Sequence, residues 1–230
     1  MLLPAIGAHA SRQVEEHGWV LLPRFFDPGD GATHRLAKLA ARIGKVAPGR
    51  AGSRVAIEEL RPLSQLEGRP HSLTQKHGLG PFPFHTDCAH YPIPSRFVLL
   101  LCAQCLTSTA PTAILTIGSL VLGQDERNVC MRGVFLVRNG RSSFYTSALS
   151  QAHGFLRFDE GCMVPVSPVG KGTAELLRTR ISSASPAFVH WSPGDLLIID
   201  NWVALHARAG TTVPGSPRLL LRAQAFSKLP

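Results

Sequence analysis

From residue 96 onward the chain is a succession of short apolar runs separated by turn-forming residues, and this pattern constrains the fold more than any other feature. Each run is rich in Val, Ile, Leu or Phe. The runs occupy residues 96–106, 112–122, 133–140, 142–148, 155–158, 187–191, 195–201 and 218–226. Eight or so short strands with turn signals between them predict a β-sandwich, jelly roll or barrel.

Helices are expected at only a few places. Residues 27–44 begin with an Asp-Pro start signal, end at Gly44, and repeat apolar residues at helical spacing. Residues 172–184 form the one convincing helix later in the chain. We therefore expect a mainly β protein with flanking helices.

Residues 45–80 are rich in Gly, Pro and Arg, with one strand-like piece at 54–60. Long loops without structure of their own are uncommon unless they are functional. We interpret this segment as an active-site loop or lid. No stretch reads as a linker or a repeat, so we predict a single domain over residues 1–230.

The composition is typical of a folded protein and limits the kinds of partner that the chain can be expected to bind. Hydrophobic residues make up 44% and charged residues 17%, and no apolar run has the length of a membrane span. The net charge is +9, but the 24 basic residues are scattered without a basic stripe, so we expect no nucleic-acid partner. Five cysteines, an odd number, favour free thiols in a reducing cytoplasm.

The segment 81–92, PFPFHTDCAHYP, holds the most informative polar residues. In an extended segment residues i and i+2 point to the same side, so His85 and Asp87 can converge on one ion. H-x-D alone is a weak signal, because a histidine hydrogen-bonded to a carboxylate in a turn is the commoner explanation.

A distant histidine changes this weighting. His206 follows a buried strand and a polar corner, 119 residues beyond Asp87. Two imidazoles and one carboxylate are the facial triad of non-haem Fe(II), which leaves coordination positions open. The separation suits ligands from opposite ends of a barrel better than a local zinc loop.

Two arginines then follow on the expected strand 218–226. Arg218 and Arg222 are four residues apart and share a face. Either could pair bidentately with a carboxylate, as a dicarboxylate co-substrate requires. Taken singly, an arginine on a late strand is usually a surface residue.

Together FHTD (84–87), WSPGDLLIIDNWVALHAR (191–208) and PRLLLRA (217–223) resemble the Fe(II)/2-oxoglutarate-dependent dioxygenases of the taurine dioxygenase and clavaminate synthase-like superfamily. The early stretch GWVLLPRFFDP is similar to the family's N-terminal strand, so the resemblance covers nearly the whole chain. It implies a double-stranded β-helix core (jelly roll, cupin-like) with flanking helices.

The resemblance also implies a site. The iron ligands would be His85, Asp87 and His206, with 2-oxoglutarate and O2 as co-substrates. Arg218 would bind the distal carboxylate of 2-oxoglutarate, and Arg222 and Thr112 would lie near its other end. Because Asp87 stands where iron halogenases of this superfamily have a small residue, hydroxylation is favoured over halogenation.

Five residues are candidates for contact with the primary substrate. They are Gln75 and His77 in the loop before the metal motif, Arg157 in FLRFDEGCM, and Trp202 and Arg208 on either side of His206. The family pattern has no role for His90, which we place at the pocket rim or in solvent. The expected substrate is a small polar molecule, such as an amino acid or biosynthetic intermediate, free or carrier-bound.

Alternatives stay open at this point. The same cofactor chemistry can end in desaturation, cyclisation or epimerisation. A barrel that binds a metal or a small acid without catalysis is the alternative from another class, and the triad with its arginine argues against it. A nucleic-acid demethylase of the same superfamily would call for a basic stripe. The short chain predicts a reduced insertion in the barrel.

Overall fold

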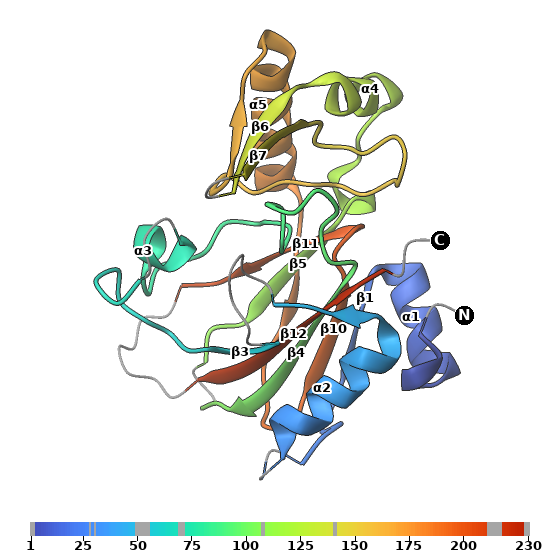
Figure 1. Ribbon diagram of the computed structural model, residues 1–230, viewed down its shortest axis with the longest axis vertical. Coiled ribbons are helices and arrows are strands. Elements are labelled where there is room, and N and C mark those ends of the chain that lie inside the picture. Colours follow the sequence, from blue (N-terminus) through green and yellow to red (C-terminus); the bar gives the residue numbers. More distant parts are fainter. Residues whose placement is uncertain are drawn as a thin grey trace.

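The computed structural model is built on two antiparallel sheets that enclose a common core, with helices outside them and a lobe at one end (Figure 1). The described residues are 3–27, 29, 31–48, 56–68, 72–106, 109–139, 142–210 and 218–227. The major sheet has the order β1-β10-β4-β12-β2, and β3 also pairs with β12. Its strands are β1 (Trp19–Leu22), β2 (Lys45–Val46), β3 (Ile57–Leu60), β4 (Phe97–Gln104), β10 (Leu196–Asp200) and β12 (Leu219–Phe226).

Strand β4 is buried on both faces, which explains its unbroken apolar sequence FVLLLCAQ. Leu99 and Leu101 pack in the core under the helices. Val98 and Leu100 point the other way, into the core between the two sheets. Full burial of such a side chain stabilises the fold by roughly 1.5–3 kcal/mol. Because its alternate side chains enter both cores, this strand joins the two layers.

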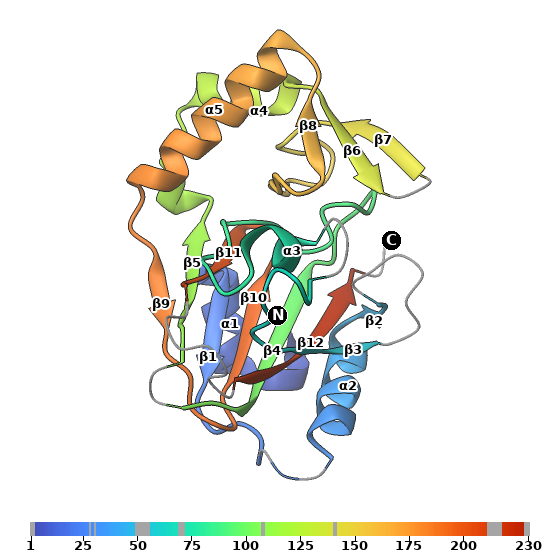
Figure 2. The ribbon, with the colours of Figure 1, turned by 90° about the vertical axis from the view of Figure 1, so that its left-hand side faces the viewer.

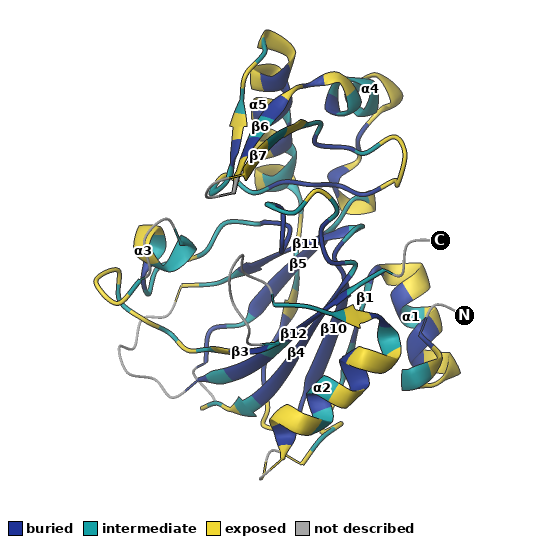
Figure 3. Ribbon diagram, viewed as in Figure 1, coloured by how far each residue is buried: buried dark blue, intermediate teal, exposed yellow. Residues whose placement is uncertain are grey.

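Helices α1 (Ala8–His17) and α2 (Ala32–Ile43) cover the outer face of the major sheet. α2 buries Leu36, Leu39 and Ala40 against the sheet, and Figure 3 shows its exposed residues on the side facing solvent. The helix predicted over residues 27–44 is thus confirmed from residue 32 onward.

The minor sheet has the order β11-β5-β9 and consists of β5 (Thr112–Thr116), β9 (Ala187–Val189) and β11 (Ala204–Arg208). A bridge between His85 and His206 adds the segment around residue 85 to the free edge of β11. Ile114, Val189 and Ala204 pack in the core between the sheets. The mainly β, jelly-roll core predicted from the sequence is confirmed.

Residues 117–186 leave the sandwich after β5 and return at β9, forming a lobe with a third sheet of order β7-β6-β8 (Figure 2). Its elements are η2 (Gly118–Leu120), α4 (Gln124–Arg132), β6 (Phe135–Asn139), β7 (Ser142–Thr146), β8 (Met163–Pro165) and α5 (Pro168–Ser183). The strands expected at 133–140 and 142–148 pair with each other here and not within the barrel. The run at 112–122 ends as a strand at Thr116, and α4 was not predicted.

The lobe shares a core with the minor sheet. Leu115 and Leu205 of that sheet pack in one cluster with Cys130, Phe135 and Leu177 of the lobe. The lobe is therefore anchored on the sheet that carries His206.

The segment 45–80 contains β2, β3 and the short helix α3 (Leu73–His77). In Figure 1, α3 lies on the opposite side of the molecule from α1. The strand expected at 54–60 is confirmed from Ile57 onward, while 49–55 and 69–71 lie outside the described residues. A lid function for this segment stays a prediction. Across the described parts of the chain, none of the helices has the length and apolarity of a membrane span.

Candidate metal centre

Two histidines far apart in the sequence are paired across the edge of the minor sheet. The N–H of His85 donates to the carbonyl of His206 at 3.0 Å, and the N–H of His206 donates to the carbonyl of His85 at 3.2 Å. Directly opposed residues project to the same face of a sheet, and the two imidazole centroids are 4.6 Å apart. The bridge therefore brings the two rings together.

Asp87 completes a cluster of three possible ligands. Its Oδ1 lies 3.6 Å from Nε2 of His85, and its Oδ2 lies 3.9 Å from Nε2 of His206. One ligand atom from each residue lies within 4.8 Å of the others, and all three residues are buried. This donor set suits Fe(II) with open positions. The structure thus brings the three predicted residues together.

Hydrogen bonds around the cluster orient its members. The Nδ1–H of His85 donates to the carbonyl of Pro83 at 2.9 Å, which leaves Nε2 of that ring able to bind a metal. Asn201 brackets the backbone of Asp87: it accepts from the Asp87 N–H and donates to the Asp87 carbonyl, both at 2.9 Å. These ligands are therefore oriented by the protein itself.

A charged network holds the carboxylate of Asp87. Arg222 on β12 donates to both of its oxygens at 2.9 Å, and the amide of Gln224 donates to Oδ2 at 3.1 Å. Nε of Arg222 also donates to Glu58 on β3 at 3.1 Å. One guanidinium thus lies between two buried carboxylates. Placement of Arg222 beside the co-substrate stays a prediction.

Glu58 and Gln224 are site residues that the sequence reasoning missed. Gln224 follows Arg222 by two positions, so the alternation of the strand could have placed it on the same face. Glu58 lies within the segment read as a lid, and only the pairing of β3 with β12 sets it opposite Arg222. No local signal in the sequence points to that pairing.

The electrostatics of the cluster prepare it for a cation. Burial opposes the charge of Asp87, but Arg222 and the two histidines outweigh burial and hold the pKa of Asp87 well below its ordinary value. Burial, together with the neighbouring charge of His85, lowers the pKa of His206 to about 3. At neutral pH the cluster therefore offers an ionised carboxylate and a neutral imidazole on β11.

Of the three residues predicted for the co-substrate, Thr112 lies where β5 and β11 pair, and Arg218 lies close enough to Arg208 for their charges to interact. Thr112 and Arg208 are directly opposed in the register, and the indole N–H of Trp191 donates to the Thr112 hydroxyl at 3.2 Å. Arg218 is buried, and no described acidic residue forms an ion pair with it. Burial, then the charge of Arg208, lower the pKa of Arg218 to about 10. Such a guanidinium can pair with a carboxylate, and the binding of a co-substrate by Arg218 and Thr112 stays a prediction.

Two of the predicted substrate residues are bound to the loop beyond the metal motif. Arg157 is fully buried, and its guanidinium donates to three carbonyls of the loop 89–92. Substrate contact by Arg157 would therefore need this loop to move. The indole N–H of Trp202 donates to the carbonyl of Pro94 at 3.1 Å, and Arg96 lies over its ring.

The other three predicted substrate residues lie around the turn after α3. Gln75 is exposed on that helix, and His77 at its end lies 6.0 Å, centroid to centroid, from the ring of Phe82. The Arg208 guanidinium lies 3.9 Å from the centroid of the same Phe82 ring. For all five residues, contact with the substrate stays a prediction.

Asp159 is a further acid whose charge acts on the metal segment. The N–H of Thr86 donates to the carbonyl of Phe158 at 2.8 Å, which joins the two segments beside the cluster. Phe158 packs in the lobe core, and the charge of the next residue, Asp159, acts on His85 and His90. Asp159 is half-buried, and its Oδ1 accepts from the N–H of Gly161 at 2.7 Å; no described cation forms an ion pair with it.

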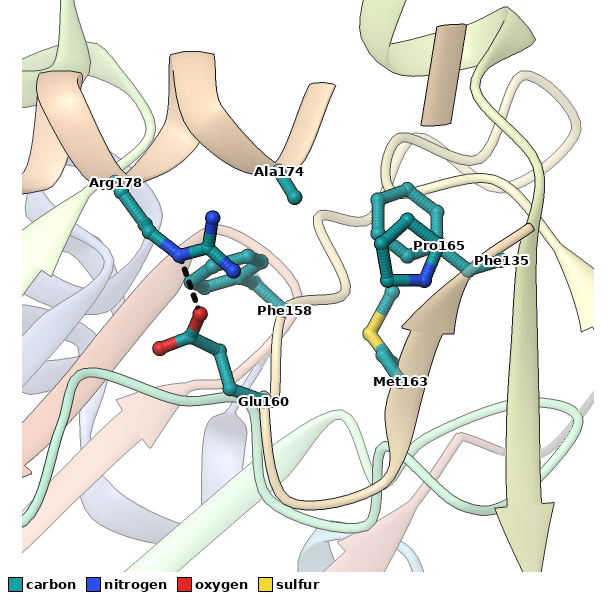
Figure 4. Close-up of a pocket in the computed structure, with 7 residues that line it drawn as sticks. All are labelled: Phe135, Phe158, Glu160, Met163, Pro165, Ala174 and Arg178. Atoms are coloured by element: carbon teal, nitrogen blue, oxygen red, sulfur yellow. Dashed lines mark hydrogen bonds and ion pairs between the residues drawn. The ribbon is translucent and has the colours of Figure 1, made fainter. Parts of the chain in front are cut away.

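A cavity of about 140 Å³ lies in the lobe and not at the metal cluster (Figure 4). Its lining consists of Phe135, Phe158, Glu160, Met163, Pro165, Ala174 and Arg178. Glu160 and Arg178 form an ion pair of 2.6 Å beside the apolar walls. None of the three possible metal ligands, His85, Asp87 and His206, lines this cavity, so it is separate from the metal cluster.

Fold and site together define a class of protein: a jelly roll that carries two histidines and a carboxylate at the edge of its minor sheet. No family model matches the chain. Among solved structures, asparagine oxygenase with Fe(II), 2S,3S-3-hydroxyasparagine and succinate superposes with a TM-score of 0.74 at 16% identity, covering 95% of this chain and 78% of that one.

Two further iron oxygenases share this architecture. The non-haem iron oxygenase OrfP, with Fe and α-ketoglutaric acid, has a TM-score of 0.71 at 18% identity, covering 96% of this chain and 78% of that one. PvcB from Pseudomonas aeruginosa has a TM-score of 0.70 at 18% identity, covering 98% and 81%. The likeness establishes that this chain has the fold of these oxygenases.

Proposed function

We propose that the chain is a mononuclear Fe(II)- and 2-oxoglutarate-dependent oxygenase, an oxidoreductase that uses O2 to hydroxylate a small polar molecule. The observation that carries the proposal is the buried cluster of His85, Asp87 and His206 inside a jelly-roll core. The likeness in fold to structures that hold Fe(II) with succinate or α-ketoglutaric acid supports it.

The side chains of the cluster and its surroundings fit both an Fe(II) ion and 2-oxoglutarate. Nε2 of His85 faces the cluster because its Nδ1–H is bonded to Pro83, and Arg222 keeps Asp87 ionised. Iron bound there would supply, with 2-oxoglutarate and O2, the oxidation of an unreactive C–H bond. Arg218 would bind the distal carboxylate of 2-oxoglutarate.

The proposed substrate is an amino acid, free or attached to a carrier. Asparagine oxygenase and OrfP were solved with 2S,3S-3-hydroxyasparagine and (3S)-hydroxy-L-Arg, respectively. Asp159 is half-buried, has no described ion pair and already accepts the N–H of Gly161 through Oδ1, so its Oδ2 would accept a hydrogen bond from a positively charged or amide side chain of such a substrate. Desaturation, cyclisation or epimerisation are alternative outcomes of the same chemistry.

Five free thiols suit a cytoplasmic enzyme.

Turnover of 2-oxoglutarate tests the proposal. The protein is loaded with Fe(II) under nitrogen, exposed to O2 with 2-oxoglutarate and a panel of amino acids, and assayed for succinate and for products heavier by one oxygen atom. We expect succinate to form only when both Fe(II) and an amino acid are present. H206A should form none. Metal binding with no consumption of 2-oxoglutarate on any substrate pool would instead support a non-catalytic metal-binding barrel.

A further inference from the structure

Two buried side chains extend the hydrogen bonding of the candidate metal ligand Asp87. The amide of Gln224 on β12 donates from Nε2 to Oδ2 of Asp87 at 3.1 Å. At its other end, Oε1 of the same amide accepts from the thiol of Cys88. Cys88 and Gln224 are both buried, so bulk water does not compete for these bonds. The thiol, the amide and the carboxylate therefore form a continuous chain of hydrogen bonds.

The chemistry of its two neighbours gives the Gln224 amide one orientation. An ionised carboxylate only accepts hydrogen bonds, so the NH2 group has to face Asp87. The thiol of Cys88 is a donor, and Oε1 is the end of the amide that accepts from it. Turning the amide over would bring Oε1 against the negative charge of Asp87 and lose a buried hydrogen bond. Cys88 thus holds the amide in the orientation that serves Asp87.

The backbone at Cys88 is unusual. Its φ is +57°, a left-handed conformation that is uncommon for a residue other than glycine. Such conformations persist where the surrounding structure holds them, and they cluster at functional sites. Cys88 directly follows Asp87, whose backbone is bonded on both sides by Asn201. The left-handed turn therefore occurs at the one residue whose side chain joins the metal segment to Gln224.

The two carboxylate oxygens of Asp87 are held unequally. Of the donors in the described parts of the chain, Arg222 and Gln224 both reach Oδ2, whereas Arg222 alone reaches Oδ1. Oδ1 also lies 3.6 Å from Nε2 of His85, a possible ligand atom. Gln224 therefore occupies Oδ2 and leaves Oδ1 with more capacity to bind a cation.

We propose that Cys88 and Gln224 are a pair of positioning residues that hold Oδ2 of Asp87 and present its Oδ1 to a divalent metal ion. The inference rests on the proposed function, because the metal site is the one proposed there. Cys88 acts through Gln224: the thiol fixes the amide, and the amide fixes the carboxylate. Loss of the thiol frees the amide to turn and the carboxylate to rotate, so metal binding weakens although every ligand is still present.

Metal binding, measured without turnover, tests the pair. Mn(II) is titrated into the metal-free protein under nitrogen by calorimetry, and the absorption bands of the Co(II) form report ligand geometry. Q224M keeps the length of the side chain but removes the amide, and it should raise the Kd for Mn(II) about 10- to 100-fold. C88A should raise this Kd about 10-fold, whereas C88S, which keeps a donor, should stay within about threefold of wild type. The Co(II) bands should shift in Q224M and C88A alike. C130A, which removes a buried thiol from the lobe core, is the matched control and should change neither readout.

A double variant and an infrared measurement test whether Cys88 acts through Gln224. If the thiol works only through the amide, C88A/Q224M should bind Mn(II) no more weakly than Q224M alone. The S–H stretching band of Cys88 is identified as the band missing from C88A. Because hydrogen bonding weakens the S–H bond, this band should lie at lower frequency in the wild type than in Q224M.

Three results would overturn the pair alone. A wild-type Kd and wild-type Co(II) bands in C88A would show that the thiol positions nothing. Losses that multiply in C88A/Q224M would reveal two independent structural effects. An S–H band that Q224M leaves unmoved would remove the hydrogen bond on which Cys88 acts. Failure of the wild-type protein to bind either Mn(II) or Co(II) would overturn the proposed function as well.

Discussion

The guanidinium of Arg222 donates to both carboxylate oxygens of Asp87 at 2.9 Å. Because Arg222 also binds Glu58, a single positive charge serves two buried negative ones. A divalent cation at the cluster would add positive charge beside Asp87. Arg222 and a bound divalent cation would then both neutralise this carboxylate.

Removing Arg222 is expected to make the fold depend on the metal. R222Q leaves Asp87 and Glu58 buried without a cation, and we expect it to lower the free energy of unfolding by about 3–5 kcal/mol. Added Mn(II) should then raise the melting temperature of R222Q more than that of the wild type. Urea and thermal unfolding, with and without Mn(II), measure both effects. R178Q, at an exposed ion pair, should cost less than about 1 kcal/mol. Metal-free R222Q as stable as wild type would contradict the network.

Asp87 is expected to be the indispensable anionic ligand. D87N keeps the shape of the side chain but removes its charge, so iron retained after desalting should fall and 2-oxoglutarate consumption should drop at least about 100-fold. H90Q is the matched control, because His90 lies in the same segment without belonging to the cluster. Wild-type iron content and turnover in D87N would rule out this ligand set.

Arg218 is expected to set the affinity for 2-oxoglutarate. R218Q removes a charge-assisted pair of about 1.5–3 kcal/mol, so the Kd should rise about 10- to 100-fold. Titration calorimetry on the Mn(II) form reads this directly, without turnover. The melting temperature should change little, since Arg218 has no described carboxylate partner to lose. An unchanged Kd would move the co-substrate site elsewhere.

Asp159 is expected to select the side chain of the substrate. D159N should raise the KM for amino acids with cationic side chains about 10-fold or more while leaving the Kd of 2-oxoglutarate unchanged. The adjacent E160Q alters an acid paired with Arg178 and serves as the control. If D159N and E160Q gave the same substrate profile as the wild type, Asp159 would have no part in selection.

The pH dependence of metal-free stability should report on His206. Its pKa is lowered from 6.5 to about 3 by burial and by the charge of His85. Below the ordinary histidine pKa, the unfolded chain takes up a proton that the folded protein refuses, so stability falls as pH drops from 6.5 towards 3. Urea unfolding in EDTA should show a flatter dependence for H206Q. H34Q, at an exposed position on α2, should keep the wild-type slope, and an equal slope in H206Q would refute the assignment.

Much of the barrel was predictable because its signals are local. The unbroken apolar runs of β4 and β10 indicate strands buried on both faces, and both form at the centre of the major sheet. The lobe was harder to foresee. Its runs at 133–140 and 142–148 look like barrel strands, because alternation identifies a strand but not its pairing partner.

The sequence by itself determined the strand pattern and brought forward His85, Asp87 and His206, since spacing and residue chemistry are properties of the chain alone. Only the tertiary structure decided what surrounds them. It set Glu58 opposite Arg222 through the pairing of β3 with β12, and it bound Arg157 to loop carbonyls. Such contacts depend on register and burial between segments far apart in the chain, which no local pattern encodes.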